Sequence, residues 1–190
     1  MNKEIFLIVG ESGSGKTTIA EKLEEKYGLK SIQSYCTRLP RYNGETGHIF
    51  VTDEEFDKLT DMVAYTKFNN YRYCATSEQV ETHDLYIIDP KGVDYFREHY
   101  KGGKNIKVIY ISSDLVARYE RMKNRAKNNG DIYLKAVKSA LNRITNDVIE
   151  FKSYNDGTAD IDRVFYNNMN DDINAVTDKI YEYIKSCERW

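Results

Sequence analysis

The chain has 190 residues, of which 41% are hydrophobic and 31% charged, and its formal net charge at pH 7 is -2. This size and composition are typical of a globular protein with a single apolar core. A net charge so close to zero gives the whole molecule no electrostatic attraction to nucleic acid or to anionic membranes, so we expect neither as a partner.

The three cysteines, Cys36, Cys74 and Cys187, are far apart and show no metal-binding spacing. Their odd number argues against a disulfide framework, and we expect reduced thiols in the cytoplasm. The first apolar run, EIFLIV at 4–9, is too short for a signal peptide or a membrane span.

Apolar, β-prone runs alternate with helical patterns along the chain. Strands are predicted at 4–9, 30–34, 84–89, 105–111 and 162–166. Helices are predicted at 19–27, 90–100, 114–127, 131–152 and 170–185. Near-continuous hydrophobic strands alternating with helices indicate an α/β fold with a doubly wound, five-stranded parallel sheet.

Residues 35–80 break this alternation. The segment 38–47 is a predicted loop because it contains proline and glycine, and Thr52 with Glu55 has the spacing of a capping box at the start of a short helix. Two β-prone runs, 62–68 and 71–76, flank an Asn-Asn pair and predict a hairpin. We interpret residues 35–80 as a small lobe inserted into the main fold.

The stretch GESGSGKT at 10–17 satisfies the G-x-x-x-x-G-K-[ST] pattern, and it lies between a predicted strand and a predicted helix. Its glycines allow successive backbone N–H groups to turn inward around a phosphate at a helix N-terminus. We expect Lys16 to reach the β- and γ-phosphates of ATP and the Thr17 hydroxyl to bind Mg²⁺. The expected ATP-binding residues of this loop are Gly10, Glu11, Ser12, Gly13, Ser14, Gly15, Lys16, Thr17 and Thr18.

A second motif, SYCTRLPR at 34–41, carries two arginines whose guanidinium groups suit a small phosphate ester. With Glu45, Gly47, His48 and Phe50 after it, this stretch resembles the Ser-x-x-Thr-Arg-x-x-Arg segment of the guanylate kinase family of nucleoside monophosphate kinases. The resemblance continues through IIDPKGV at 87–93, RMKNR at 121–125, Arg143-Ile144 and VFYNN at 164–168, and so covers nearly the whole chain.

The resemblance implies ATP- and Mg²⁺-dependent phosphoryl transfer to a nucleoside monophosphate, GMP or dGMP, by a monomer or weak homodimer. It divides the chain into a P-loop core (1–34, 81–120 and 136–190), an acceptor-binding lobe (35–80) and a lid (121–135). The groups that neutralise the moving phosphoryl group are then Lys16, Arg121, Arg125 and Arg143. Asp89 stands at the acidic position near Mg²⁺, and Asn167 near the adenine of ATP. The acceptor-binding residues are Ser34, Arg38, Arg41, Glu45, His48, Tyr73, Ala75 and Thr76.

The segment 115–143 holds eight Lys or Arg residues and two acids, a local charge of +6. Three of these residues are the lid arginines, whose charge is expected to neutralise the phosphoryl group. The other basic residues are expected on a solvent-exposed helix face: Arg118, Lys123, Lys127, Lys135 and Lys138.

The base-reading positions depart from the family pattern. The usual glutamate falls on Met62 or Ala64, with Asp61 beside them, and the usual hydroxyl falls on Ala75, followed by Thr76. A kinase for another nucleotide or small phosphate ester therefore stays an alternative. So does a non-catalytic interaction domain of this fold, although an intact Lys16-Thr17 argues against it. A GTPase switch would need an Asn-Lys-x-Asp run, which the sequence lacks.

Overall fold

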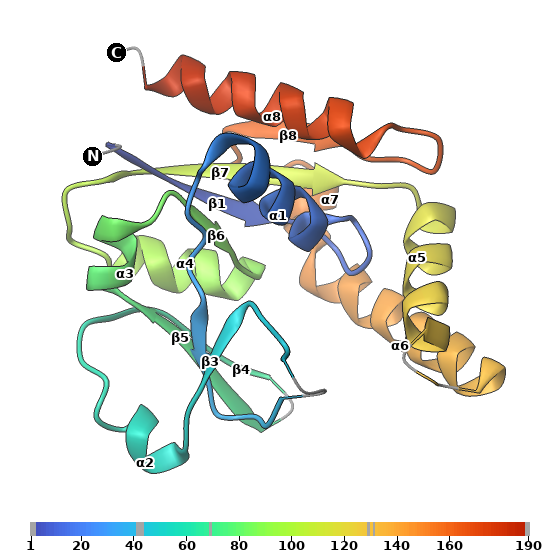
Figure 1. The fold of residues 1–190 in the computed structure, drawn as a ribbon, viewed down its shortest axis with the longest axis horizontal. Coiled ribbons are helices and arrows are strands. Elements are labelled where there is room, and N and C mark those ends of the chain that lie inside the picture. Colours follow the sequence, from blue (N-terminus) through green and yellow to red (C-terminus); the bar gives the residue numbers. More distant parts are fainter. Residues whose placement is uncertain (1–2, 41–43, 69, 129, 131, 189–190) are drawn as a thin grey trace. The chain divides into compact units, whose positions relative to one another are not determined.

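The computed structural model describes residues 3–40, 44–68, 70–128, 130 and 132–188 (Figure 1). The chain divides into two compact units. One consists of Met1–Leu7 and Gly28–Lys107, and the other of Ile8–Tyr27 and Val108–Trp190.

The main sheet is formed by β1 (Glu4–Val9), β6 (Leu85–Ile87), β7 (Asn105–Ser112) and β8 (Arg163–Tyr166). Among the described residues its order is β6-β1-β7-β8, and β7 pairs with β8 in parallel. The predicted strand at 30–34 is reduced to a single parallel bridge between Ser31 and Leu85. This run is short and mostly polar, and only its Ile32 side chain has an apolar core to enter, so it gains little from a longer pairing.

Strand β1 is buried along its whole length, and five of its six side chains are apolar with no exposed surface. A strand that is apolar on both faces fits the inside of a covered parallel sheet. Its last residue, Val9, leads directly into the phosphate loop, so the loop starts from one of the best-packed segments of the protein.

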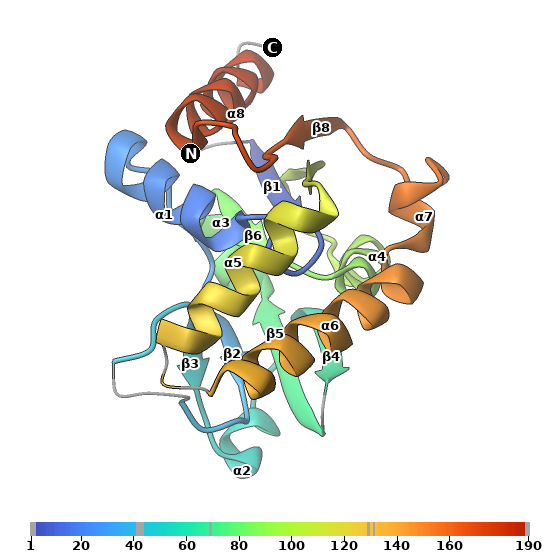
Figure 2. The ribbon, with the colours of Figure 1, turned by 90° about the vertical axis from the view of Figure 1, so that its right-hand side faces the viewer.

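The second unit contains α1 (Lys16–Tyr27), α5 (Leu115–Asn128), α6 (Tyr133–Glu150), α7 (Lys152–Asn155) and α8 (Ile173–Cys187). Helices α5 and α6 run side by side as a hairpin (Figure 2). Helix α1 packs on α8, where the Tyr27 and Tyr181 rings stack with centroids 3.6 Å apart. No described helix is both long and apolar enough to cross a membrane.

The first unit contains a second sheet, built from β2 (Ser34–Cys36), β3 (His48–Phe50), β4 (Met62–Phe68) and β5 (Tyr71–Thr76) in the order β3-β2-β5-β4. The antiparallel pairing of β4 with β5 confirms the predicted hairpin. The helices of this unit are α2 (Asp53–Phe56), α3 (Ser77–Thr82) and α4 (Pro90–His99).

The thiols of Cys36 and Cys74 are buried in the second sheet, and burial raises the pKa of Cys74 to about 12.

The predicted capping box at α2 is confirmed. The Thr52 hydroxyl accepts a hydrogen bond from the Glu55 N–H (3.1 Å), and the Glu55 carboxylate accepts one from the Thr52 N–H (2.8 Å). Arg72 of β5 then fastens the helix to the sheet by pairing with Asp53 and Asp57. The box therefore sets where this short helix begins.

Replacing Thr52 by alanine removes one half of the box and leaves the Glu55 N–H without its cap. We expect the Thr52→Ala variant to lose about 1 kcal/mol of unfolding free energy. Urea denaturation followed by circular dichroism measures the loss. Thr60→Ala, at an exposed threonine beyond the helix, is the matched control and should change stability by less than about 0.5 kcal/mol. Equal effects of the two substitutions would contradict the role of the cap.

Candidate active site

The phosphate loop, residues 10–15, joins β1 to α1 and depends on glycines for its shape. Gly13 and Gly15 have φ angles of +80° and +100°, which favour glycine. A side chain at Gly15 would also meet the Asn167 amide at 2.4 Å, and one at Gly13 would meet the Arg118 carbonyl at 2.7 Å. The loop therefore accepts no side chain at these two positions without moving its supports.

Several backbone N–H groups of the loop are free to bind an anion. The Ser12 N–H is bound by Asp147 and the Ser14 N–H by the Glu11 carbonyl. Within the described part of the chain, no acceptor binds the N–H groups of Gly13, Gly15, Lys16 and Thr17. Successive N–H groups at the start of a helix form a phosphate-binding nest.

Lys16 lies at the first turn of α1 and bends back over the loop. Its Nζ donates to the carbonyl oxygens of Gly10 (2.5 Å) and Glu11 (3.1 Å). Burial lowers the pKa of Lys16 to about 8, and the charge of Asp147 opposes this shift. The guanidinium groups of Arg143, Arg118 and Arg125 lower the pKa further, so these cations are close enough to act on Lys16.

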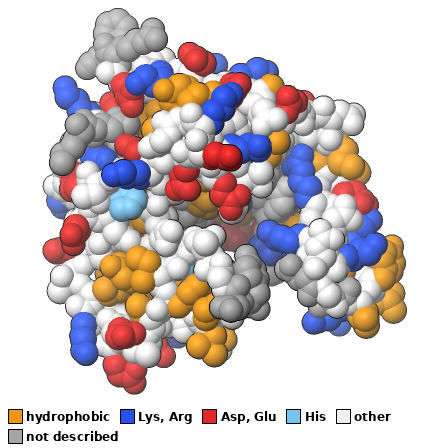
Figure 3. Space-filling model, in the orientation of Figure 1, with side chains coloured by type: hydrophobic (Ala, Val, Ile, Leu, Met, Phe, Trp, Pro, Cys, Tyr) orange, Lys and Arg blue, Asp and Glu red, His pale blue; other side chains and the backbone are white. Residues whose placement is uncertain are grey.

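Among the three predicted lid arginines, Arg143 of α6 donates from Nε to the Ser12 hydroxyl (3.3 Å). Arg125 is exposed on the last turn of α5. Lys and Arg side chains gather over α5 and α6 on the face seen in Figure 3. Arg143 thus contacts the loop, and the positive charges of Arg143 and Arg125 both act on Lys16.

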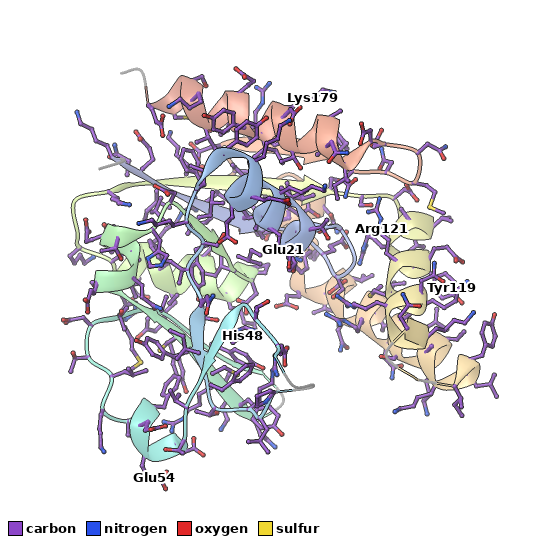
Figure 4. The ribbon with its side chains drawn as sticks, viewed as in Figure 1. Glu21, His48, Glu54, Tyr119, Arg121 and Lys179 are labelled. Carbon is purple, nitrogen blue, oxygen red and sulfur yellow. The ribbon has the colours of Figure 1, made fainter. Side chains whose placement is uncertain are left out.

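Arg121, the remaining lid arginine, reaches from α5 to the loop and to the end of β8 (Figure 4). Its Nη1 donates to the carbonyls of Gly13 (3.3 Å) and Asn167 (3.0 Å), and its Nη2 to the carbonyl of Asn168 (2.9 Å). Burial lowers the pKa of Arg121. Its guanidinium group supports the backbone here, and contact with a phosphoryl group stays a prediction.

Asn167 is fully buried behind the loop. Its side-chain amide donates to the Ser14 carbonyl (2.8 Å), and its backbone N–H donates to the Ser112 carbonyl (2.9 Å). Asn167 thus fastens the loop to β7, and its expected contact with adenine stays a prediction.

Arg118 is not on a solvent-exposed face, so that expectation was wrong. Only 5% of the residue is exposed, and its guanidinium group pairs with Glu11 and with Asp147, each at 2.6 Å. A guanidinium group can be buried when carboxylates replace its water. Of the other four basic residues, Lys123 is half-buried beside Glu120. The remaining three are exposed as expected: Lys127, Lys135 and Lys138.

Asp147 is the main residue of this site that the sequence did not reveal. Its carboxylate binds the Ser12 N–H (2.8 Å) and hydroxyl (3.1 Å) as well as Arg118. One signal was present: Asp147 follows Arg143 by four residues, which puts both on one helix face.

In the first unit, two of the predicted acceptor-binding residues bind each other. Arg38 donates to both carboxylate oxygens of Glu45, at 2.8 and 2.6 Å, with about 6% and 7% of the two side chains exposed. The Glu45 carboxylate raises the pKa of Arg38. Arg38 Nε has no partner in the described part of the chain, and Arg41 lies outside the described residues.

Three further predicted acceptor-binding residues lie together on this sheet. The Ser34 hydroxyl is 2.9 Å from Nδ1 of His48, and the His48 and Tyr73 rings meet edge to face with centroids 5.6 Å apart. Burial raises the pKa of Tyr73, which keeps its hydroxyl protonated. A hydroxyl, an imidazole and a phenol can all donate hydrogen bonds to phosphate oxygens.

The positions expected to read the base are apolar. Ala64 of β4 and Ala75 of β5 are cross-strand partners, and both are buried. Thr76, which we considered as a substitute hydroxyl, caps α3 by accepting from the Gln79 N–H (3.4 Å). Asp61 uses its carbonyl to accept from the Ser77 N–H. The two alanines are thus neighbours on one face of the sheet, and neither side chain can form a hydrogen bond with a base.

Thr17 and Asp89 were expected near Mg²⁺. Thr17 is exposed on the first turn of α1, and Asp89 is the N-cap of α4, where it accepts from the Gly92 N–H (2.6 Å). Burial raises the pKa of Asp89. The described residues contain no group of three or more His, Cys, Asp or Glu side chains that could hold a metal.

Comparisons with known proteins agree with this geometry. Residues 6–150 match the family described as AAA domain. The chain is 30% identical over 166 residues to the guanylate kinase of Neisseria gonorrhoeae, and the match covers 80% of this chain and 80% of the relative. It is 29% identical over 169 residues to the guanylate kinase of Neisseria meningitidis serogroup A, and that match covers 82% of this chain and 81% of the relative. The crystal structure of the guanylate kinase from Anaplasma phagocytophilum superposes with a TM-score of 0.59 over all of this chain and 88% of the other, at 19% identity, which shows a shared fold. The chain therefore belongs to the P-loop AAA domain family and, by its relatives, to the guanylate kinase family.

Proposed function

We propose that this protein transfers the γ-phosphoryl group of ATP to a nucleoside monophosphate, GMP or dGMP, giving ADP and a nucleoside diphosphate. The observation that carries the proposal is the phosphate loop, with Lys16 and four N–H groups that no described acceptor binds, in a chain 30% identical to a guanylate kinase across most of both lengths. An interaction domain would have no use for this loop, and no observation favours that alternative.

The donor half of the reaction needs charge neutralisation on the phosphates of ATP. Four loop N–H groups without a protein acceptor suit the β-phosphate. The Lys16 ammonium group is bound by two loop carbonyls and can move from them to the β- and γ-phosphates. Arg143 and Arg125 add further positive charge. Mg²⁺, when bound, screens the phosphate oxygens, and the Thr17 hydroxyl is the loop's group suited to hold it.

The acceptor half must hold a second phosphate in line with the first. Ser34, His48 and Tyr73 offer adjacent donors, and the Arg38–Glu45 pair keeps a guanidinium group in a fixed orientation beside them. Arg41, three residues after Arg38, supplies a second guanidinium group. A nucleophilic phosphate oxygen of the acceptor then forms its bond to the γ-phosphorus as the bond to the ADP oxygen breaks.

The roles of these residues suggest how the chain divides into a core, an acceptor lobe and a lid. Residues 35–80 would form the acceptor lobe and 121–135 the lid, with the rest as the core. We further propose that the protein acts in the cytoplasm as a monomer or weak homodimer.

Lys16→Ala should lower kcat by about a hundredfold or more and leave the fold intact, because it removes charge that acts chiefly in the transition state. A coupled ADP-release assay with ATP, Mg²⁺ and GMP measures the effect. Lys22→Ala, at a partly exposed lysine of the same helix whose Nζ donates to Asn174, is the control and should keep near-normal turnover. Normal turnover in Lys16→Ala would exclude the loop as the phosphate site.

Arg41→Ala should act on the acceptor alone. A charged hydrogen bond contributes about 1.5–3 kcal/mol, so kcat/KM for GMP should fall about tenfold to a hundredfold while KM for ATP changes little. Arg38→Ala should lower kcat/KM for GMP similarly but also destabilise the fold, because the buried Glu45 carboxylate loses the guanidinium group that pairs with it. Lys58→Ala, at an exposed lysine of the same lobe, is the control. A large rise in KM for ATP in Arg41→Ala would reverse the assignment of the acceptor site.

The facing alanines predict weak base selection. We expect a preference for GMP over AMP below about a thousandfold in kcat/KM, since a pocket with polar readers can reach about 10⁴-fold or more. Ala75→Ser should improve GMP use a few-fold, about the contribution of one neutral hydrogen bond. Cys74→Ser, whose hydroxyl points to the other face of β5, should give no improvement. A preference above about 10⁴-fold, or no gain from Ala75→Ser, would mean that other residues read the base.

A further inference from the structure

Three charged side chains are buried against the phosphate loop: Glu11, Arg118 and Asp147. About 10%, 6% and 6% of these side chains are exposed. Arg118 lies between the two carboxylates and contacts each at 2.6 Å. The group joins the loop to α5, which carries Arg118, and to α6, which carries Asp147 (Figure 2).

This cluster holds every polar group of Ser12. The Asp147 carboxylate accepts from the Ser12 N–H (2.8 Å) and from its hydroxyl (3.1 Å), and Arg118 Nε donates to its carbonyl (3.0 Å). Ser12 is therefore fixed by charged groups of two helices that lie more than a hundred residues later in the sequence.

The other loop carbonyls also have hydrogen-bond donors within the protein. Lys16 binds those of Gly10 and Glu11, and Arg121 binds that of Gly13. The Ser14 carbonyl accepts from Asn167, and that of Gly15 from the Ile19 N–H. Because each peptide unit points its N–H opposite to its carbonyl, binding the carbonyls also fixes the direction of the N–H groups.

Burying Arg118 together with its two carboxylates has an unfavourable contribution to the folding free energy. Burying three charges carries a desolvation penalty, and an apolar cluster of the same volume is often as stable or more so. Fold stability alone is thus a weak reason for charges here. Orientation is a stronger one, because a guanidinium group with two carboxylates fixes both the direction and the distance of the Ser12 peptide units.

We propose that Arg118 and Asp147 are positioning residues of the donor site. They hold Ser12 so that the following N–H groups are already turned toward the β-phosphate before ATP binds. They also tie the loop to the helices that carry Arg125 and Arg143, so the basic side chains and the nest keep a common geometry. The inference rests on the proposed function for its reaction, but its test requires only nucleotide binding.

The first variant is Asp147→Asn, which keeps the size of the side chain and one acceptor oxygen but removes the charge that pairs with Arg118. The second is the double variant Arg118→Met with Asp147→Leu, which replaces the ions by apolar side chains of similar volume. The matched control is Asp162→Asn, because the Asp162 carboxylate also accepts a backbone N–H, that of Val108 (2.8 Å), away from the loop.

Calorimetric titration with ADP and Mg²⁺, with no acceptor present and below the onset of unfolding, gives the dissociation constant. We expect ADP binding to weaken at least tenfold in Asp147→Asn and in the double variant, and to stay within twofold in Asp162→Asn. In the coupled assay KM for ATP should rise with little change in KM for GMP.

Thermal unfolding separates positioning from stability. If the cluster only stabilised the fold, the apolar double variant would regain both its melting temperature and its ADP affinity. The proposal requires that affinity stay at least tenfold weaker even where the melting temperature is restored. ADP binding within twofold of wild type in either variant would overturn it. A wild-type protein that binds ADP but phosphorylates no monophosphate would instead refute the proposed function and leave this test intact.

Discussion

A loop that offers its N–H groups to a ligand must direct its carbonyl groups elsewhere. The conformation of the phosphate loop therefore depends on the groups that donate hydrogen bonds to those carbonyls. In this protein each carbonyl from Gly10 to Gly15 has a protein donor, and four of the donor side chains are Lys16, Arg118, Arg121 and Asn167. They come from α1, α5 and the end of β8. The packing of the second unit therefore supports the conformation of this short loop.

This requirement changes how the basic segment 115–143 is understood. Its charge does not act as one surface patch. Arg118 and Arg121 face inward and bind backbone, whereas Arg125 and Arg143 remain near Lys16 on the exposed side. Arg118 and Arg121, three residues apart on α5, thus both support the loop backbone. Arg125, on the next turn of α5, is exposed and can reach a ligand.

The sequence predicted well those features that local chemistry determines. The loop motif, the α/β class with a parallel sheet, the hairpin at 62–76 and the Thr52 capping box each depend on residues close in sequence, and all four agree with the structure. Arg118 was wrongly expected in solvent because its partners, Glu11 and Asp147, are distant in sequence and a single acid on a polar helix gives little signal. The run at 30–34 formed only a bridge because its burial depends on neighbours that the pattern of one short segment does not reveal.

The buried thiols of Cys36 and Cys74 have a consequence for the chemistry of the sheet formed by β2, β3, β4 and β5. Only the thiolate reacts readily with oxidants and alkylating reagents, and at neutral pH Cys74, with a pKa of about 12, is almost entirely protonated. Neither side chain is exposed to a reagent in solution. The thiols of β2 and β5 are thus protected from oxidation, and Cys187 at the end of α8 is the thiol that a reagent meets first.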